Sequence, residues 1–102
     1  MIELVVIDGL TCPKVFCDSC GEEIQDAKQA AIVFKNFMNN GQRTNVTYVH
    51  KDFVKGNCLS QAEASIRAQG GQPGWEELGT HLADLLSNVG IDSQDITRRL
   101  GA

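Results

Sequence analysis

The sequence predicts a single α+β domain that begins with a strand, continues with a β-hairpin and ends with helices. Three observations lead to this fold class. A β-branched, apolar run lies near the N-terminus, two further strand-like segments flank an Asn-Gly pair, and the apolar residues of the second half follow helical spacing. The 102 residues suit one domain, residues 1–102, which we divide into a subregion at 1–70 and a C-terminal helical pair at 75–102.

The composition is that of a globular chain. Hydrophobic residues make up 42% of the sequence and charged residues 22%. We expect a cytoplasmic protein without a membrane segment, because no apolar run reaches the roughly 20 residues that span a bilayer and the start lacks the basic region of a signal peptide. The net charge of −4 argues against binding to nucleic acid.

The N-terminal segment has the features of β-structure. Ile2–Asp8 is rich in β-branched residues and is followed by a glycine, which predicts a strand. Lys14–Phe16 should be extended, because the preceding proline disfavours a helix there. Residues 21–31 suit either a short helix or an irregular turn, with Ile24 pointing inward.

The middle of the chain predicts a hairpin followed by a helix. Ala31–Phe37 and Asn45–His50 are strand-like, and the loop between them contains Asn-Gly at 40–41, a strong turn pair. A capping-box pattern starts at Ser60, and the helix should end at Gly70, where glycine favours termination.

The C-terminal part predicts two helices. The first should cover Trp75–Val89 and carry one apolar stripe, formed by Trp75, Leu78, Leu82, Leu85, Leu86 and Val89. A glycine at position 90 is well placed as its end. A last short helix should begin at Asp92 or Ser93.

Two cysteines in the first quarter suggest metal binding. Cys17 and Cys20 are three positions apart and are followed by Gly21. This Cys-x-x-Cys-Gly pattern is the first half of a zinc knuckle. A tight turn brings two thiolates to one ion, and glycine relieves the crowding behind them. In a chain without a signal peptide, cysteines of this kind are more often ligands or free thiols than disulfides.

Two more soft donors follow at the ends of expected elements. His50 closes the second hairpin strand, and Cys58 precedes the expected helix, whose N-terminus should lower the pKa of its thiol. Seven residues separate them, a wide spacing that leaves Asp52 and Cys12 as reserve candidates for the fourth ligand in place of Cys58. From Cys17 to about Gln69, the order of knuckle, hairpin and helix resembles treble-clef zinc fingers.

The whole chain is also similar to a group of small, uncharacterised bacterial proteins. These combine a CDxCG-type zinc knuckle, a strand that ends in a histidine, and a C-terminal pair of helices. The resemblance implies zinc binding and no known activity. It lies in Cys17, Asp18, Cys20, Gly21, Ile24, His50, Cys58, Trp75, Leu78, Leu82, Leu85, Leu86, Asn88, Gly90 and Asp92.

The predicted function is that of a structural zinc-binding protein that acts as a small interaction module. One Zn²⁺ per chain would be held by Cys17, Cys20, His50 and Cys58, although the same ligands also suit iron. Four protein ligands close the shell, and the sequence contains no zinc-deaminase, H-E-x-x-H, phosphate-loop or G-x-S-x-G motif, so we expect no enzyme activity. The expected partner is another protein or a second copy, bound through the C-terminal helices.

Two alternatives stay open. A nucleic-acid-binding transcriptional regulator would need a basic face, whose candidates are Lys28, Lys35, Arg43, Lys51 and Lys55. A thiol redox protein would use Cys17 and Cys20 as a reversible dithiol. Asp18 and the second histidine, His81, are expected to be solvent-exposed or edge residues without a role in the metal site.

Overall fold

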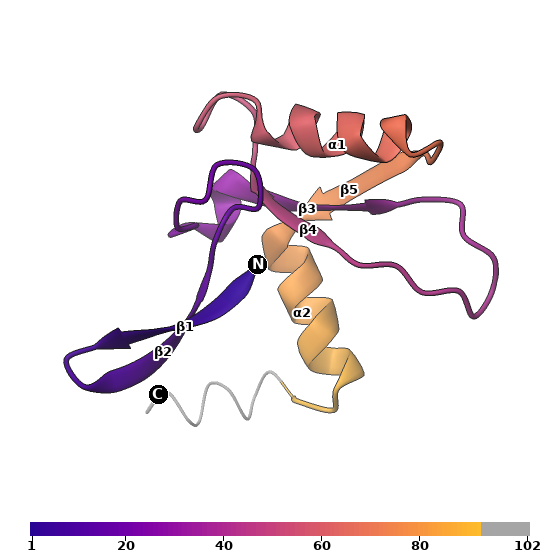
Figure 1. Cartoon of the computed structure of the whole chain (residues 1–102). Helices are drawn as coiled ribbons and strands as arrows, with labels where there is room; N and C mark the ends of the chain where they lie inside the picture. Colours follow the sequence, from indigo (N-terminus) through magenta and orange to yellow (C-terminus); the bar gives the residue numbers. More distant parts are fainter. Residues whose placement is uncertain (93–102) are drawn as a thin grey trace.

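A computed structural model describes residues 1–92 of the chain. In this part the fold is α+β, as expected, with two antiparallel sheets and two α-helices (Figure 1). The first sheet is a hairpin, and the second has the strand order β4-β3-β5. The elements are β1 (Ile2–Ile7), β2 (Leu10–Val15), the 3₁₀ turn η1 (Ala27–Gln29), β3 (Ala30–Lys35), β4 (Thr47–His50), α1 (Cys58–Ala68), β5 (Pro73–Glu77) and α2 (Leu78–Asn88).

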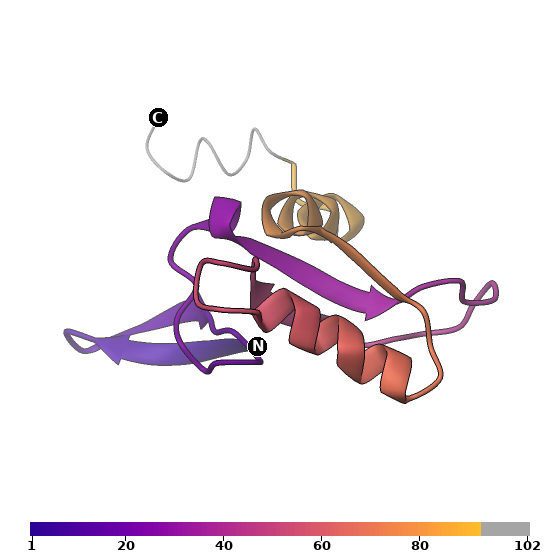
Figure 2. The same ribbon diagram turned by 90° about the horizontal axis from the view of Figure 1, so that it is seen from above.

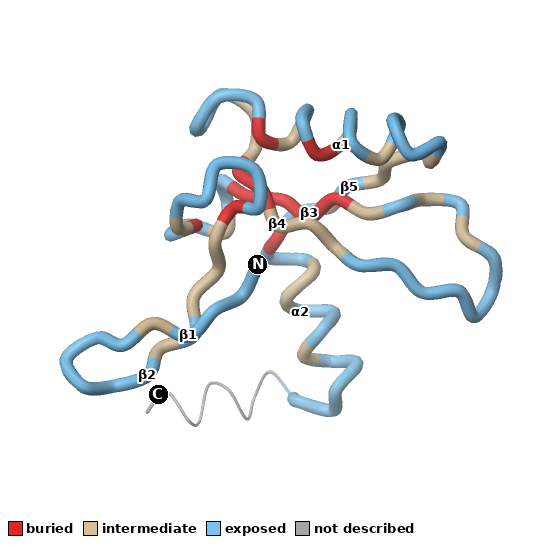
Figure 3. The backbone as a smooth tube through the Cα atoms, in the orientation of Figure 1, coloured by how far each residue is buried: buried red, intermediate tan, exposed pale blue. Residues whose placement is uncertain are grey.

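The central strand β3 is covered on both faces. Helices α1 and α2 lie on opposite sides of the three-stranded sheet (Figure 1, Figure 2). Val33 faces the α1 side, where it lines a groove together with Ala62 and Ile66. Successive strand residues alternate between faces, so Ile32 points to the α2 side. This double cover explains why residues 30–33 are all buried, as the red segment of the tube shows (Figure 3).

The N-terminal hairpin projects from this body. Asp8 and Gly9 both have positive φ angles, 52° and 79°, as in the type I′ turns that suit two-residue hairpin loops. The expected first strand is confirmed as β1, but β2 is longer than the extended segment expected at Lys14–Phe16. Pro13 fits within β2 because this strand lies at an edge of its sheet, where a missing N–H costs no ladder hydrogen bond.

The expectation of a helix over Trp75–Val89 is wrong for its first three residues. Trp75 lies in β5, where it pairs with Val33 of β3, and α2 begins only at Leu78. Paired residues share a face of the sheet. Trp75 is therefore on the side of α1 and is not part of the apolar stripe of α2. Pairing with a distant strand has overridden the local helical spacing.

Other boundaries differ less. Helix α1 begins at Cys58, two residues before the expected start, and its end is confirmed: Gly70 has φ 84°, and its N–H donates to the carbonyl of Arg67. Ile24 is buried, as expected. The last expected helix lies outside the described residues, apart from Asp92. Within residues 1–92, none of the helices has the length and apolar character needed to cross a membrane.

Two glycines offer a paired test of the packing around β5. A Cβ at Gly74 would lie 2.7 Å from the ring of Phe34, whereas a Cβ at Gly79 would meet nothing within 4 Å. Gly74→Ala should lower the free energy of unfolding by about 1–3 kcal/mol through overpacking. Gly79→Ala, in the first turn of α2, should raise it by about 0.5–1 kcal/mol. Urea denaturation of both variants checks this, and an unchanged midpoint for Gly74→Ala would contradict the close packing of β5 on Phe34.

Candidate metal centre

The segment 17–22 forms a tight loop that presents two thiols. The N–H of Cys17 donates to the carbonyl of Glu22 at 2.9 Å, and the N–H of Gly21 donates back to the carbonyl of Cys17 at 2.9 Å. Gly21 has φ 79°, which glycine adopts without strain. The N–H of Cys20 points at the Sγ of Cys17 at 3.5 Å. In this loop, which we call the knuckle after its sequence pattern, a backbone N–H points at a sulfur.

Two donors from other elements meet this loop. His50 is the last residue of β4, and Cys58 is the first residue of α1. The ligand atoms of Cys17, Cys20, His50 and Cys58 all lie within 4.8 Å of one another, and the Sγ of Cys20 is 3.5 Å from the Nδ1 of His50. Cys20 is exposed, whereas the other three side chains are buried. The structure thus brings all four predicted site residues to one point.

The donor set fits one soft metal ion. Three sulfurs and one imidazole nitrogen are a common set for tetrahedral zinc, with Zn–S distances of about 2.3 Å that imply separations between ligand atoms of roughly 3.8 Å. The observed spread is close to this size. Thiolate and imidazole donors also suit iron, so the geometry is compatible with a metal site and does not distinguish between the two metals.

The surroundings shift the pKa values of two thiols in opposite directions. Burial raises the pKa of Cys17, but the backbone N–H groups of Cys20, His50 and Ser19 outweigh it and bring the pKa down to about 6. Burial, followed by the neighbouring sulfurs of Cys17 and Cys20, raises the pKa of Cys58 to about 12. The expectation that the helix N-terminus lowers the pKa of Cys58 is therefore wrong in the metal-free chain. A metal that binds here at neutral pH must displace the proton of Cys58.

Neither reserve ligand joins the cluster. The Oδ1 of Asp52 accepts a hydrogen bond from the backbone N–H of Ser60 at 3.1 Å, and its Oδ2 accepts one from the hydroxyl of the same residue. Asp52 is thus engaged at the N-terminus of α1, and these hydrogen bonds lower its pKa. Cys12 lies on β2, and its Sγ is 3.9 Å from the carbonyl oxygen of Leu10.

Asp18 has a structural role that the sequence did not reveal. Its N–H donates to the carbonyl of Tyr48 at 2.7 Å, its Oδ2 accepts from the N–H of Tyr48 at 2.8 Å, and its Oδ1 accepts from the ammonium of Met1 at 3.0 Å. The knuckle is thereby fixed to the edge of β4. Ser19 adds a hydrogen bond from its hydroxyl to the carbonyl of Cys58, 3.1 Å long. The only signal in the sequence was the position of two short polar residues inside the knuckle.

The second histidine is not part of the cluster. His81 lies on α2, where its ring packs edge-on against Tyr48 with the centroids 5.9 Å apart, and its Nδ1 is 3.6 Å from a carboxylate oxygen of Glu76. This is the edge position that the sequence suggested.

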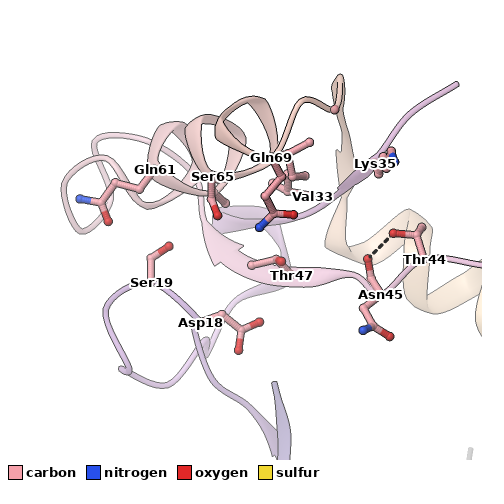
Figure 4. A pocket seen from close by; sticks show the side chains of 13 residues that line it. Asp18, Ser19, Val33, Lys35, Thr44, Asn45, Thr47, Gln61, Ser65 and Gln69 are labelled. Carbon is pink, nitrogen blue, oxygen red and sulfur yellow. Dashed lines mark hydrogen bonds between the residues drawn. The ribbon is translucent and has the colours of Figure 1, made fainter.

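A polar groove of about 450 Å³ runs beside the knuckle, between α1 and β4. Asp18 and Ser19 lie at one end, and Gln61, Ser65 and Gln69 extend toward it from α1 (Figure 4). Its lining combines hydroxyl and amide groups with the apolar side chains of Val33, Ala62 and Ile66 and the charged groups of Asp18 and Lys35. The groove thus offers several hydrogen-bonding groups beside the cluster.

Comparison with known proteins gives no relative from which to transfer a function: no protein family, curated protein or solved structure matches the chain.

The role of Asp52 can be separated from that of the four clustered residues. Asp52→Ala should leave the metal content of the purified protein unchanged, because the carboxylate serves α1. The amide of Ser60 should exchange faster with solvent, since it loses its acceptor. Elemental analysis and amide hydrogen exchange measure the two effects. A folded Asp52→Ala chain that has lost most of its metal would make Asp52 a ligand.

Proposed function

We propose that the protein is a structural zinc-binding protein that acts as a small interaction module. The observation that carries the proposal is the convergence of four ligand atoms within 4.8 Å, from the knuckle, the end of β4 and the start of α1. An ion bound there joins three segments that lie far apart in the sequence. The order of knuckle, β3–β4 hairpin and α1 supports a treble-clef-like module.

A structural role fits this ligand set better than a catalytic one. A catalytic zinc ion keeps one coordination position for water, whereas three thiolates and one imidazole fill a tetrahedral shell. Three of the four side chains are buried, and the backbone N–H of Cys20 points at the Sγ of Cys17. We therefore assign no enzyme activity to the site.

Metal removal tests this assignment. The protein should contain one Zn²⁺ per chain, and Cys20→Ser should unfold the knuckle and loosen β3, β4 and α1, because structural zinc contributes roughly 10–16 kcal/mol of binding free energy in small finger peptides. Cys12→Ser is the matched control, since Cys12 lies outside the cluster. Elemental analysis and amide NMR spectra report the results. An unchanged spectrum for Cys20→Ser, or after strong chelation, would show that no metal holds the fold.

The two alternative functions have weaker support. The Sγ atoms of Cys17 and Cys20 are parts of a larger set of four donors, which favours a metal over a redox dithiol. For nucleic-acid binding, Lys51 and Lys55 of the five candidate cations form ion pairs with Glu77 and Glu22. This pairing reduces the positive charge available to a phosphate backbone.

A protein partner is the better match for the C-terminal half. Leu85 of α2 is 41% exposed and Val89, directly after α2, is 62% exposed, while Trp75 is 48% exposed on the opposite side of the sheet. Exposed apolar side chains that lie together are typical of protein-interaction sites. We propose that the partner binds at α2. This partner is either a different protein or a second copy of the chain.

The partner class leads to a direct prediction. In a gel-shift assay at about 150 mM salt, the protein should bind neither duplex nor single-stranded nucleic acid, because its net charge of −4 opposes association with phosphates. Lys35→Glu should change nothing in this assay. A Kd for nucleic acid below about 1 μM would overturn the protein-partner proposal and favour the alternative of a transcriptional regulator.

A further inference from the structure

The β1–β2 hairpin exposes an unusual amount of apolar surface. Leu4 is 68% exposed, Val6 71% and Leu10 69%, while Ile2 is 49% exposed. The hairpin extends away from the rest of the molecule, and the other described elements leave both of its faces largely uncovered (Figure 1, Figure 2). An isolated two-stranded hairpin is marginally stable in water, and additional strands are the usual remedy.

The hydrogen-bond pattern shows which backbone groups of β1 are free. Met1 and Phe16 exchange two hydrogen bonds, of 2.6 and 2.7 Å, so they form a hydrogen-bonded pair of the ladder. Such pairs alternate along an antiparallel ladder, so the odd-numbered residues of β1 bond to β2. The N–H and C=O groups of Ile2, Leu4 and Val6 therefore point outward, with no partner in residues 1–92.

The two edges of the hairpin differ. On β2 the same alternation places Pro13 among the outward residues, and its missing N–H obstructs the addition of a strand. The outward positions of β1 carry no proline, no lysine and no bulge, which are the usual protections of an edge strand. Only the β1 edge of the hairpin is open to another strand.

The β1 edge is complementary to itself. When two β1 strands run antiparallel with Leu4 opposite Leu4, Ile2 of each copy lies opposite Val6 of the other. These three pairs each exchange two hydrogen bonds between the outward groups. Every side chain in them is uncharged, and Glu3 lies opposite Val5 rather than opposite the second Glu3. Both bonding and charge thus suit a second copy.

We propose that the chain self-associates through this edge. Two β1 strands pair around a twofold axis at Leu4 and join the hairpins into one four-stranded sheet, β2-β1-β1-β2. The contact is isologous, so it closes at two copies. Its pairing side chains come within the distance at which cross-strand neighbours stabilise a sheet. The exposed stripe of α2 then serves a different protein.

A charge-reversal pair tests the register. Wild-type protein should show a concentration-dependent dimer in sedimentation from about 1 to about 200 μM. Leu4→Lys and Leu4→Glu should each weaken the dimer at least about tenfold, because like charges face each other at the axis. An equimolar mixture of the two variants should restore a dimer, since Lys then faces Glu. Val89→Lys, the matched control at the exposed residue directly after α2, should dimerise like the wild type.

Amide hydrogen exchange in the wild type provides an independent measurement. The N–H groups of Leu4 and Val6 should exchange more slowly as the protein concentration rises, while the N–H of Val5, bonded to β2, stays protected throughout and reports a folded hairpin. A wild type that is monomeric at the highest concentration overturns the proposal, as does a dimer that survives Leu4→Lys or is lost in Val89→Lys. Protection of Leu4 and Val6 in a monomer would assign the edge to an occupant from the same chain.

Discussion

The fold depends on the burial of one strand, β3, on both edges and both faces. Strands β4 and β5 pair with its edges, while α1 and α2 cover its faces. Four successive side chains, those of residues 30–33, are buried as a result. The other elements of the three-stranded sheet and both α-helices are placed by their relation to β3. The ends of β4 and α1 meet the knuckle at one end of the sheet, and that end is where the four donors converge.

Few large side chains are buried around β3, so a cross-link at the four donors would contribute much to the stability of the fold. The largest fully buried side chains are Ile32, Leu78, Val33, Val49 and Cys17, so a sulfur stands among the main components of the core. A chain of this size has a limited margin of stability from apolar burial alone. One ion that binds four side chains would add a cross-link where the apolar contacts end. This is the physical reason for a structural rather than a catalytic assignment.

The sequence predicted the parts of the fold that local patterns determine. β1, β3, β4 and the glycine end of α1 follow from residue type and spacing. His50 and Cys58 were predicted at the ends of a strand and a helix, and this was enough to predict which four residues lie together. Contacts between residues far apart in the sequence determine the remaining elements. Strand β5 forms because Trp75 pairs with Val33, although the spacing from Trp75 to Leu78 is helical. The capping of α1 by Asp52 likewise depends on how the preceding loop turns back.

The knuckle and the hairpin share their connecting residues, so the two proposed roles are linked. The N–H of Ile24 donates to the carbonyl of Val15 at 2.8 Å, Phe16 bridges to Glu23, and Lys14 forms an ion pair with the same glutamate. The loop that carries two of the thiols thus fixes the base of the hairpin and its direction. If an ion binds the four donors as proposed, it would hold this loop in place and so lower the entropy cost of pairing the β1 edge. Because such coupling is reciprocal, pairing of the hairpins would then strengthen metal binding by the same factor.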